Sequence, residues 1–577
     1  MRPARSEQLQ REQQADRANA EAAASPVRAT GVLPPEAALR LGRRRLLGVA
    51  LAAGIGFSAI AGQLVRLSVS LDTDIRTSSA EAIASSHSRP DIVDRNGRII
   101  ATDVAGRSLY ADPAMLLDPD QATEALATVL PDLDRNALRT QLYDRHRRFV
   151  WIKRGLTPRQ AQSVHDLGLP GIAFRRELRR IYPDGALVGH IVGQVDPDNR
   201  GISGLEKFLD DQGMVQEVHG AHPSRARPVR LSLDLGVQHA LADVLAGAVK
   251  TFEAKGAAGI VMAADTGAVL GCYSWPPIDP SIPGSRLDPG RPDLIHASVF
   301  ELGSIMKSFT VAMMLDEGLA TLDKTYDVGK PLTFGRFHIN DFHRHAGAMT
   351  VRDIFVRSSN VGSAEMALQA GAARQRAFLE RIGLINPVRT EAGPVAAPLL
   401  PERWGEVETA TIAFGHGLAL APMQVMASAA SLVNGGLRVE PTYLAGATRP
   451  DPSFARVLSP ATSRKIREIM RLNVTLPYGT GRRAKSEGYR VGGKTGTAEM
   501  PGRHGYRKRA VVSSFLSTFP ADKPGYVVLI ALIEPQPTPA TRGSITASVN
   551  AAPVTAALVH RIAPILGVLP RRIARVK

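Results

Sequence analysis

The sequence predicts a large α/β domain built on an antiparallel sheet flanked by helices, preceded by a smaller α+β domain and a single transmembrane helix. Three observations carry this prediction: a charge-free apolar run near the N-terminus, a region of short strand-like runs and turns, and a long region that mixes helical and strand patterns. The boundaries predicted from these patterns are a cytoplasmic tail over 1–45, the transmembrane helix over 46–66, a pedestal over 67–228 and the large domain over 229–577.

The composition fits a globular chain of several domains. Of the 577 residues, 44% are hydrophobic and 22% are charged, which excludes a mostly disordered chain. The net charge of +17 suits an anionic partner such as nucleic acid, a membrane surface or an acidic polymer, and does not choose among them. Aromatic residues make up only 5%, which disfavours a nucleic-acid binder that works by stacking. The single cysteine, Cys272, excludes internal disulfides and cysteine-based metal frameworks, and we expect it to be a small buried residue.

The apolar run over 46–65 predicts the membrane anchor. At about 1.5 Å per residue in a helix it is about 30 Å long, the thickness of the bilayer's hydrocarbon core. Three arginines, Arg43 to Arg45, precede it directly, so the tail should stay in the cytoplasm and the rest of the chain should lie outside. The tail is rich in Gln, Ala, Glu and Arg, which is typical of disorder. A cleaved signal peptide is the alternative, but this apolar run and the tail are both longer than usual for one.

The region over 67–228 predicts a pedestal without catalytic machinery. A turn at Asp94–Gly97 between two apolar pairs indicates a hairpin, and the Leu- and Ala-rich stretch over 114–145 has helical spacing. Gly201–Glu206 is typical of the start of a short helix, and a basic linker over 222–230 closes the region. We find no nucleophile with a neighbouring base here.

The region from 229 on predicts the flanked antiparallel sheet. Apolar residues from Val237 to Phe252 mark one face of a helix. A strand, a turn and a second strand follow over 260–270, and two β-rich runs over 511–519 and 526–533 are separated by a turn. A last helix is predicted over 551–566.

Three short motifs in the large domain carry the candidate chemistry. In Ser304-x-x-Lys307 a helical spacing of three brings a hydroxyl and an amine to one face, and a lysine of lowered pKa can activate a serine. In Ser358-x-Asn360 a hydroxyl and an amide can face one cleft, where the hydroxyl can pass a proton and the amide can hold a carbonyl or the lysine. Each of these two motifs alone is weak evidence for catalysis, because a capped helix or a polar loop can have the same pattern.

The third motif is Lys494-Thr495-Gly496-Thr497. Lys494 and Thr495 on an edge strand can bind a carboxylate, and Gly496 leaves room for an extended substrate. The backbone N–H of Thr497 can stabilise an oxyanion. The three motifs occur in the order found in serine acyltransferases that react with penicillin.

With these motifs the chain resembles the class B penicillin-binding proteins, the monofunctional peptidoglycan D,D-transpeptidases. The resemblance extends over about 46–567 and includes Arg89–Gly97, Arg180–Pro183 and Gly201–Glu206 in the pedestal. Pro90 stands where the family usually has Gly. The loop Phe414–Gly417 and the long N-terminal tail resemble the division-specific, FtsI-type branch, and the elongation-specific branch is the alternative.

The resemblance implies a serine-type D-Ala-D-Ala transpeptidase. In it Ser304 is the nucleophile and Lys307 its base, while Ser358 relays a proton and Asn360 orients the lysine and the substrate. Lys494 and Thr495 hold the terminal carboxylate, and the N–H groups of Ser304 and Thr497 form the oxyanion hole beside Gly496. The implied substrates are peptidoglycan pentapeptide stems ending in D-Ala-D-Ala, and β-lactams are the implied covalent inhibitors. No cofactor and no metal is implied.

The resemblance also implies a place in the cell: a single-pass protein of the inner membrane with a cytoplasmic N-terminus and a periplasmic catalytic domain. The expected partners are an FtsW-type glycan polymerase and other division proteins, and no nucleic acid. A non-catalytic scaffold of the division machinery, a β-lactamase and a membrane sensor of β-lactams are the competing functions. A β-lactamase would not need a membrane anchor and a pedestal, and a membrane sensor would be expected to have more than one span.

Two groups of histidines receive structural interpretations. His338, His343 and His345 could be metal ligands, but no thiol joins them and the implied chemistry needs no metal. His416 is expected to shape a loop rather than to act as a base.

Overall fold

The computed structural model describes residues 47–48, 50–63, 66, 85–219, 226–345, 347–502 and 505–571. The chain forms two compact units, Met1–Ile83 and Ala84–Lys577. The predicted cytoplasmic tail over 1–45 lies outside the described residues, as do 67–84 of the predicted pedestal and residues 222–225 of the predicted linker.

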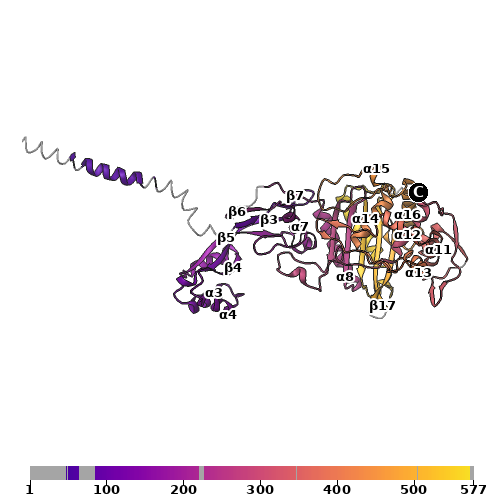
Figure 1. The fold of residues 1–577 in the computed structure, drawn as a ribbon, viewed down its shortest axis with the longest axis horizontal. Coiled ribbons are helices and arrows are strands. Elements are labelled where there is room, and N and C mark those ends of the chain that lie inside the picture. Colours follow the sequence, from indigo (N-terminus) through magenta and orange to yellow (C-terminus); the bar gives the residue numbers. More distant parts are fainter. Residues whose placement is uncertain are drawn as a thin grey trace, which may run out of the picture. The chain divides into compact units, whose positions relative to one another are not determined.

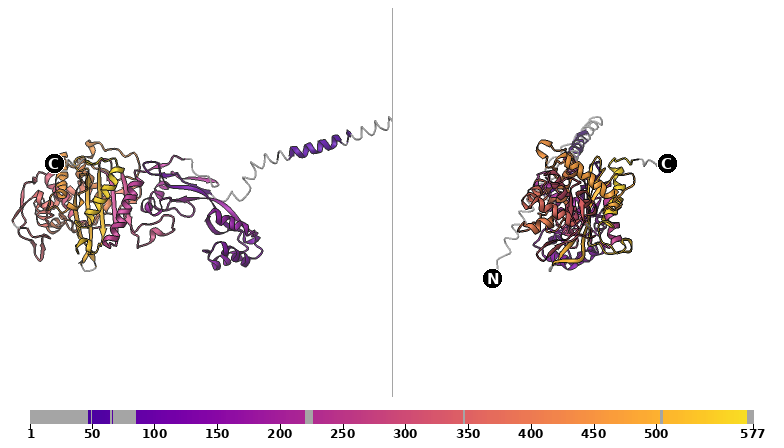
Figure 2. Two further views of the ribbon diagram at one scale, coloured as in Figure 1. Left: turned by 180° about the vertical axis from the view of Figure 1, so that it is seen from behind. Right: turned by 90° about the vertical axis from the view of Figure 1, so that its right-hand side faces the viewer.

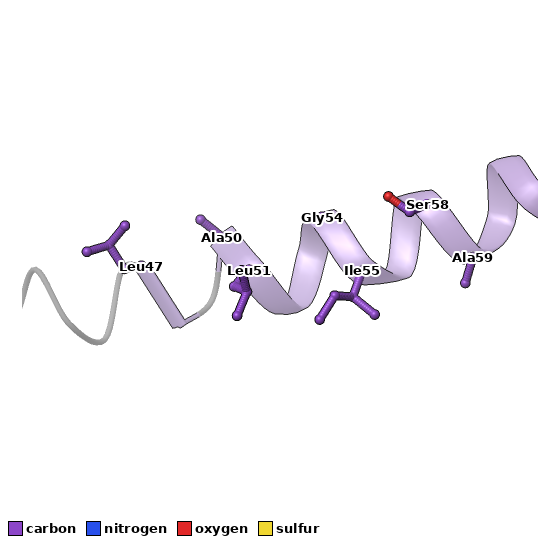
Figure 3. A pocket seen from close by; sticks show the side chains of 7 residues that line it. All are labelled: Leu47, Ala50, Leu51, Gly54, Ile55, Ser58 and Ala59. Carbon is purple, nitrogen blue, oxygen red and sulfur yellow. The ribbon is translucent and has the colours of Figure 1, made fainter.

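In the first unit, residues 50–63 form a continuous helix. The side chains of Leu51, Ile55 and Ala59 project from one side of this helix (Figure 3). Within the part of the chain that the structure describes, no helix combines the length and the apolar character needed to cross a bilayer. The predicted span over 46–66 includes residues 46, 49, 64 and 65, which are not among those described.

The pedestal contains a sheet in the order β4-β3-β2-β7, with β5 also paired to β3. The predicted hairpin is present, because β2 and β3 pair antiparallel across a turn in which Gly97 has a φ of +86°. The pairing of β2 with β7 is parallel, and a separate antiparallel pair is formed by β1 and β6. The strands are β1 (Ser85–Ser88), β2 (Ile92–Val93), β3 (Ile99–Ala111), β4 (Val150–Leu156), β5 (Ile172–Ile181), β6 (Gln216–His219) and β7 (Val229–Arg230).

Three helices cover one face of β3, β4 and β5. The stretch predicted as helical over 114–145 contains two of them, because Asp134 caps a new helix by accepting hydrogen bonds from the N–H groups of Asn136 and Ala137. Apolar side chains such as Leu109 and Leu126 form the core between these helices and the sheet. The helices are α3 (Pro119–Val129), α4 (Arg135–Tyr143) and α5 (Pro158–Asp166), followed nearer the large domain by α6 (Gly189–Val192) and α7 (Gly204–Asp211).

A buried ion cluster connects the start of the pedestal to its later elements. The carboxylate of Glu206 on α7 accepts hydrogen bonds from Nε of Arg89 and Nε of Arg180, both at 2.7 Å. Arg180 also pairs with Asp103 on β3 at 3.2 Å. The charged side chains of Arg89, Arg180 and Glu206 are fully buried. Buried charges of this kind are tolerated only when they are paired, so each partner depends on the others.

The large domain is built on a five-stranded sheet in the order β16-β17-β18-β8-β9. Its strands pair antiparallel, as predicted, whereas the number and the order of the strands were not predicted. The strand β16 lies at one edge of this sheet. The strand β9 carries Cys272, which is buried as expected. The strands are β8 (Gly256–Ala263), β9 (Val269–Trp275), β16 (Gly492–Gly502), β17 (Gly505–Phe519) and β18 (Tyr526–Ile533).

Helices pack on both faces of the sheet (Figures 1 and 2). Successive residues of a strand point to opposite faces, so Ile260 and Met262 of β8 join one core and Val261 joins the other. The predicted first and last helices, α8 (Leu235–Phe252) and α17 (Ala551–Ile565), pack together on one face. The other face is covered by α9 (Lys307–Asp316), α14 (Pro422–Val433) and α16 (Pro460–Thr475).

Shorter elements complete the helical layer around α9. The helices are α10 (Val351–Arg357), α11 (Asn360–Ala370), α12 (Ala372–Arg381), α13 (Glu406–Ile412) and α15 (Pro452–Ala455). Short antiparallel pairs are formed by β10 (Thr325–Asp327) with β13 (Ala348–Thr350), β11 (Leu332–Phe334) with β12 (Phe337–Ile339), and β14 (Arg389–Thr390) with β15 (Gly393–Pro394).

The hydrophobic core continues from the pedestal into the large domain. Ile100 and Ile191 belong to the same core as Leu231 and Ile260. In the segment that leads from β9 to the first motif, the carbonyl oxygen of Ile282 accepts a hydrogen bond from Nε2 of Gln194 at 2.8 Å. The pedestal therefore packs against the segment that precedes the candidate nucleophile.

Candidate active site

The three motifs lie on three elements that meet at the edge of the large sheet. Ser304 lies in a short 3₁₀ turn, Gly303–Met306, and Lys307 begins α9 directly after it. Ser358 ends α10 in the left-handed conformation, with a φ of +66°, and Asn360 is the first residue of α11. The third motif lies on the edge strand β16.

Lys307 contacts the candidate nucleophile directly. Its Nζ donates to Oγ of Ser304 at 2.8 Å, and it also contacts Oδ1 of Asn360 at 2.7 Å and Oγ of Ser358 at 3.1 Å. The lysine is fully buried. Burial lowers the pKa of Lys307 to about 7, and the negative charge of Asp341 acts in the opposite direction. Near neutral pH a large fraction of this amine is therefore unprotonated and can accept the proton of Ser304.

Lys494 approaches the same group of side chains from the sheet. Its Nζ donates to Oγ of Ser358 at 2.9 Å and to the carbonyl oxygen of Thr495 at 3.1 Å. Burial, and then the positive charge of Lys307, lower the pKa of Lys494 well below its usual range. Ser358 thus joins the two lysines through its hydroxyl, which gives a short path for a proton.

The glycines around the nucleophile allow backbone segments to approach closely. A Cβ on Gly496 would lie 2.2 Å from the carbonyl oxygen of Leu302, and a Cβ on Gly303 would lie 2.6 Å from the carbonyl oxygen of Thr497. Only glycine fits at these positions. The two predicted oxyanion donors, the N–H groups of Ser304 and Thr497, therefore belong to segments that are in contact.

The second motif is held by a carboxylate that was not predicted. Asp341 accepts hydrogen bonds from Oγ of Ser359 at 2.7 Å, from the N–H of Val361 at 3.0 Å and from the N–H of Asn360. It lies within the histidine-containing stretch that was considered for metal binding. Among the residues that the structure describes, no group of three or more His, Cys, Asp or Glu side chains is placed to hold a metal ion. No spacing signal marks Asp341, because it meets the motif only in the folded chain.

A second residue that sequence reasoning missed supports the third motif. Oγ1 of Thr480 accepts a hydrogen bond from Oγ1 of Thr495 at 2.8 Å and donates to Oδ1 of Asn473 at 3.0 Å. These two consecutive hydrogen bonds fix the direction of the Thr495 hydroxyl. A threonine in a Gly- and Pro-containing loop carries no sequence signal for such a role.

A third group lies beside the nucleophile segment, around Glu301. Its carboxylate accepts hydrogen bonds from the N–H of Gly417 at 2.8 Å and from the hydroxyl of Tyr506 at 2.9 Å, and it lies 3.6 Å from Nδ1 of His416. Burial lowers the pKa of His416 although Glu301 acts to raise it, so this histidine is neutral at pH 7. His416 lies in a loop against Glu301.

The geometry supports acyl transfer to a serine. Lys307, a buried amine of lowered pKa, lies within hydrogen-bond distance of the candidate nucleophile Ser304 and of the Ser358 hydroxyl, which could relay a proton. A second buried amine lies beside an edge strand that can accept an extended chain. This is the arrangement that activates a serine without a histidine.

Comparisons with known proteins agree with this site. Residues 257–557 match the family model of the penicillin binding protein transpeptidase domain, and residues 85–212 match that of the penicillin-binding protein dimerisation domain. The chain is 38% identical over 487 residues to the "Probable peptidoglycan D,D-transpeptidase FtsI" of Caulobacter vibrioides, a match that covers 83% of this chain and 82% of the relative.

Two further relatives match over similar shares. The "Probable peptidoglycan D,D-transpeptidase PenA" of Neisseria meningitidis is 30% identical over 469 residues, or 78% of this chain and 80% of the relative. The "Peptidoglycan D,D-transpeptidase FtsI" of Escherichia coli K12 is 28% identical over 489 residues, or 80% and 82%. With its dimerisation domain, its transpeptidase domain and these relatives, the chain belongs to the class B penicillin-binding proteins of the FtsI type.

Proposed function

We propose that this protein cross-links peptidoglycan stem peptides during cell division, as a serine-type D-Ala-D-Ala transpeptidase in which Ser304 carries the acyl group. One observation supports this most directly: Nζ of Lys307 lies 2.8 Å from Oγ of Ser304, and burial lowers the pKa of that lysine to about 7. The division role is supported by the FtsI-type relatives. A non-catalytic scaffold is not favoured, because it would need none of these contacts.

In the first half of the reaction, Oγ of Ser304 attacks the carbonyl carbon of the penultimate D-Ala while its proton passes to Nζ of Lys307. The N–H groups of Ser304 and Thr497 stabilise the negative oxygen of the tetrahedral intermediate. The C–N bond to the terminal D-Ala then breaks. The leaving nitrogen takes a proton from Lys307 through the hydroxyl of Ser358, which lies 3.1 Å from the lysine.

In the second half, an amine of another stem attacks the acyl-enzyme. Its proton returns along the same path, and Oγ of Ser304 regains a proton as the ester breaks. Lys494 and Thr495 hold the terminal carboxylate of the donor before it leaves, and Gly496 gives the extended donor room beside the strand. Asn360 keeps Lys307 in place through the 2.7 Å contact of its Oδ1.

A β-lactam is proposed to acylate the same serine. Ring opening breaks the amide bond, but the nitrogen stays attached to the acyl fragment, so no leaving group departs and the acyl-enzyme persists. Covalent labelling with a fluorescent penicillin therefore tests the assignment. Ser304→Ala should abolish labelling and Lys307→Ala should slow it severely, because loss of the nucleophile or its base removes most of the rate.

The matched control is Ser281→Ala, which removes an exposed hydroxyl from a loop and should label like the parent. All variants should extract with the membrane fraction and unfold at similar temperatures. Undiminished labelling of a folded Ser304→Ala protein would refute the proposed nucleophile.

We also propose that 46–65 is a single membrane span, with a cytoplasmic N-terminus and a periplasmic catalytic domain in the inner membrane. The run is free of charged residues and follows Arg43–Arg45. The large apolar side chains of its described helix, including Leu51, Ile55 and Phe57, are more than half exposed within their unit. Apolar side chains exposed on all sides of a helix require an apolar solvent such as lipid.

The proposed partners are an FtsW-type glycan polymerase and other division proteins, which would meet the span and the pedestal. Gly48, Ala52, Gly56 and Ala59 recur at helical spacing and would let a second helix approach closely. Replacing Ala52 and Gly56 together by Leu should weaken co-purification with the polymerase. The control double variant is Ala50→Leu with Gly54→Leu, which adds equal bulk to the other side of the helix. If both double variants co-purify with the polymerase as the parent does, this helix face is not the interface.

A further inference from the structure

A stacked pair of side chains beside the second motif has no part in the proposed mechanism. Cζ of Arg357 lies 4.1 Å from the centre of the Tyr478 ring, which is within the range of a cation–π contact. Arg357 is the last residue of α10 and directly precedes Ser358, the proposed proton relay. Tyr478 is 43% exposed and Arg357 is half-buried. The pair is therefore accessible next to the catalytic hydroxyls.

Two hydrogen bonds place this pair at the end of the cleft where the terminal carboxylate of the donor is proposed to lie. Oγ1 of Thr480 accepts a hydrogen bond from Oγ1 of Thr495 at 2.8 Å. The N–H of Thr480 donates to the carbonyl oxygen of Val356, in the last turn of α10, at 3.3 Å. Tyr478 stands two residues before Thr480, and two residues of chain span at most about 7 Å. Tyr478 and Arg357 therefore lie just beyond Thr495, on the side of the leaving group.

Arg357 carries a charge that its surroundings do not neutralise. Among the residues that the structure describes, Arg357 forms no ion pair with a carboxylate, whereas Arg352 on the same helix pairs with Asp323 at 3.1 Å. Asp353, one turn before Arg357, accepts a hydrogen bond from the hydroxyl of Tyr478 at 3.3 Å. Stacking on a ring orients a guanidinium plane without using its N–H groups, which can then bind a carboxylate through two parallel hydrogen bonds.

The mechanism determines where the acceptor amine arrives. Both halves of the reaction pass through a tetrahedral intermediate on Ser304, and the hydroxyl of Ser358 is proposed to serve the leaving nitrogen and the attacking nitrogen alike. The attacking nitrogen therefore takes the place that the leaving nitrogen had. The rest of the acceptor then extends through the emptied subsite of the terminal D-Ala and out past Thr495, toward Arg357 and Tyr478.

The chemistry of the polymer says what the acceptor brings to this place. Donor and acceptor stems come from the same polymer, so the acceptor also ends in a carboxylate. Its amine lies on a side chain, because the α-amines are used in peptide bonds. With this amine at the acyl carbon, the main chain of the acceptor and its carboxylate lie outside the cleft, on the leaving-group side. An unpaired arginine at that position is complementary to this carboxylate.

We infer that Arg357 and Tyr478 form a subsite for the acceptor stem, in which the guanidinium group of Arg357 binds a carboxylate of the acceptor. The inference rests on the proposed function. Arg357 is a specificity-determining residue, because it selects the amine that resolves the acyl-enzyme and takes no part in the proton transfers. Tyr478 is a positioning residue, because its ring holds the guanidinium plane of Arg357.

The partition of one acyl-enzyme between an amine and water tests this in the detergent-solubilised full chain. A benzoyl-D-Ala thioester supplies the acyl group: Oγ of Ser304 attacks the thioester carbonyl, the C–S bond breaks and the thiol leaves. The acceptors are acetyl-Lys-D-Ala and its C-terminal amide, which differ in the charge of the carboxylate and lack the D-Ala-D-Ala end of a donor. The side-chain amine attacks the ester carbon, the C–O bond to Ser304 breaks, and the proton of the amine returns to Oγ.

Chromatography gives the ratio of the amide product to benzoyl-D-Ala, the product of hydrolysis. Both products come from the same acyl-enzyme, so this ratio depends neither on the rate of acylation nor on the fraction of folded protein. In the parent the ratio should be about tenfold higher with acetyl-Lys-D-Ala than with its amide at equal concentration, the amount typical of one charge-assisted hydrogen bond.

Variants of Arg357 should change this preference. Arg357→Gln should reduce it to below about threefold, and Arg357→Glu should make the amide the better acceptor, because like charges repel. The matched control is Arg464→Gln, which removes an exposed arginine from α16 and should keep the parental preference.

Variants of Tyr478 test the stacking separately. Tyr478→Phe keeps the ring and loses the hydrogen bond to Asp353, so it should keep the parental preference. Tyr478→Leu loses the ring and should reduce the preference to below about threefold. If an Arg357 variant forms no acyl-enzyme, this second pair of variants decides the question.

Equal ratios for the two acceptors in the parent, or transfer to neither, would overturn the inference. A preference that survives unchanged in Arg357→Gln and Arg357→Glu would overturn it as well, because the carboxylate would then be recognised elsewhere. Penicillin labelling of Ser304 in the same preparations separates this failure from a failure of the proposed function. Labelling without an acceptor preference sinks the inference alone, whereas absence of labelling at Ser304 in the parent sinks both.

Discussion

Lys307 and Lys494 both place Nζ within hydrogen-bond distance of one hydroxyl, that of Ser358, at 3.1 and 2.9 Å. Two buried amines this close to a shared partner cannot both carry a full charge at low cost. Burial lowers the pKa of each, and the charge of Lys307 lowers that of Lys494 further. The pair therefore holds a neutral amine near neutral pH. A serine that is activated by lysine instead of histidine needs such an amine as its base.

The first prediction concerns the pH dependence of acylation. The pKa of Lys307 is lowered to about 7 by burial, so the amine is protonated below this pH and free above it. The second-order rate constant for penicillin acylation should rise with pH, nearly tenfold per unit well below 7, and level off above it. Stopped-flow or gel-based labelling between pH 5 and 9 measures this. A constant rate from pH 5.5 to 8 would exclude Lys307 as a base with this pKa.

The second prediction concerns Asp341. Its negative charge raises the pKa of Lys307, and its carboxylate also holds Asn360 and Val361. In Asp341→Asn the acidic limb of the pH profile should therefore move to lower pH, while the maximal rate falls because the loop is held less firmly. The exposed Asp323→Asn is the control and should reproduce the parental profile. A profile of Asp341→Asn that moves to higher pH would contradict the electrostatic argument.

The third prediction concerns Gly496. A Cβ at this position would lie 2.2 Å from the carbonyl oxygen of Leu302 and 2.6 Å from Oγ of Ser514, so the nucleophile segment would have to move. Gly496→Ala should cost about 1–3 kcal/mol in the free energy of unfolding. It should slow penicillin acylation by about 100-fold, because a displacement near 1 Å misaligns the reacting atoms.

The control for Gly496 is a glycine with free space. A Cβ on Gly247, in α8, meets no atom within 4 Å. Gly247→Ala should raise the free energy of unfolding by about 0.5–1 kcal/mol through its helix propensity and leave acylation unchanged. Thermal unfolding and labelling of both variants give the comparison. If Gly496→Ala were acylated by penicillin at the parental rate, the segment around Leu302 could move aside without displacing Ser304.

The fourth prediction concerns the ion cluster of the pedestal. Glu206→Ala leaves the guanidinium groups of Arg89 and Arg180 buried without their shared carboxylate. It should lower the free energy of unfolding by about 3–5 kcal/mol. Glu124→Ala breaks exposed pairs with two arginines on α4 and should change it by less than about 0.5 kcal/mol. Equal melting temperatures for the two variants would mean that the buried cluster adds no stability.

The fifth prediction concerns topology and follows from the charge-free run over 46–65. A reporter that is active only outside the cytoplasm should work when fused after Lys577 and fail when fused before Leu46. A cytoplasmic reporter should give the reverse pattern. If the reporter that works only outside the cytoplasm were active before Leu46 and inactive after Lys577, the catalytic domain would lie in the cytoplasm, away from a wall substrate.

Local spacing and periodicity predicted the first and last helices and the main strands of the large domain, and one contact of the candidate site. Ser304 and Lys307 are three residues apart, so a helical turn alone brings the hydroxyl and the amine together. The near-continuous apolar runs of β8 and β18 likewise mark strands that are covered on both faces. The break within the helical stretch over 114–145 was not predicted; the stretch is two helices because Asp134 caps the second one.

Tertiary structure alone decided the contacts between distant segments. Ser358 meets Lys494 across 136 positions of the chain, and Asp341 meets Asn360 only because α11 packs beside the loop that carries it. Glu499 lines a pocket with Leu399 and Leu400, which reach it from another part of the chain. Such contacts leave no spacing pattern, since the packing of buried side chains, rather than the geometry of one helix or strand, sets which loops meet. The same packing removes water from Lys307 and so sets its pKa.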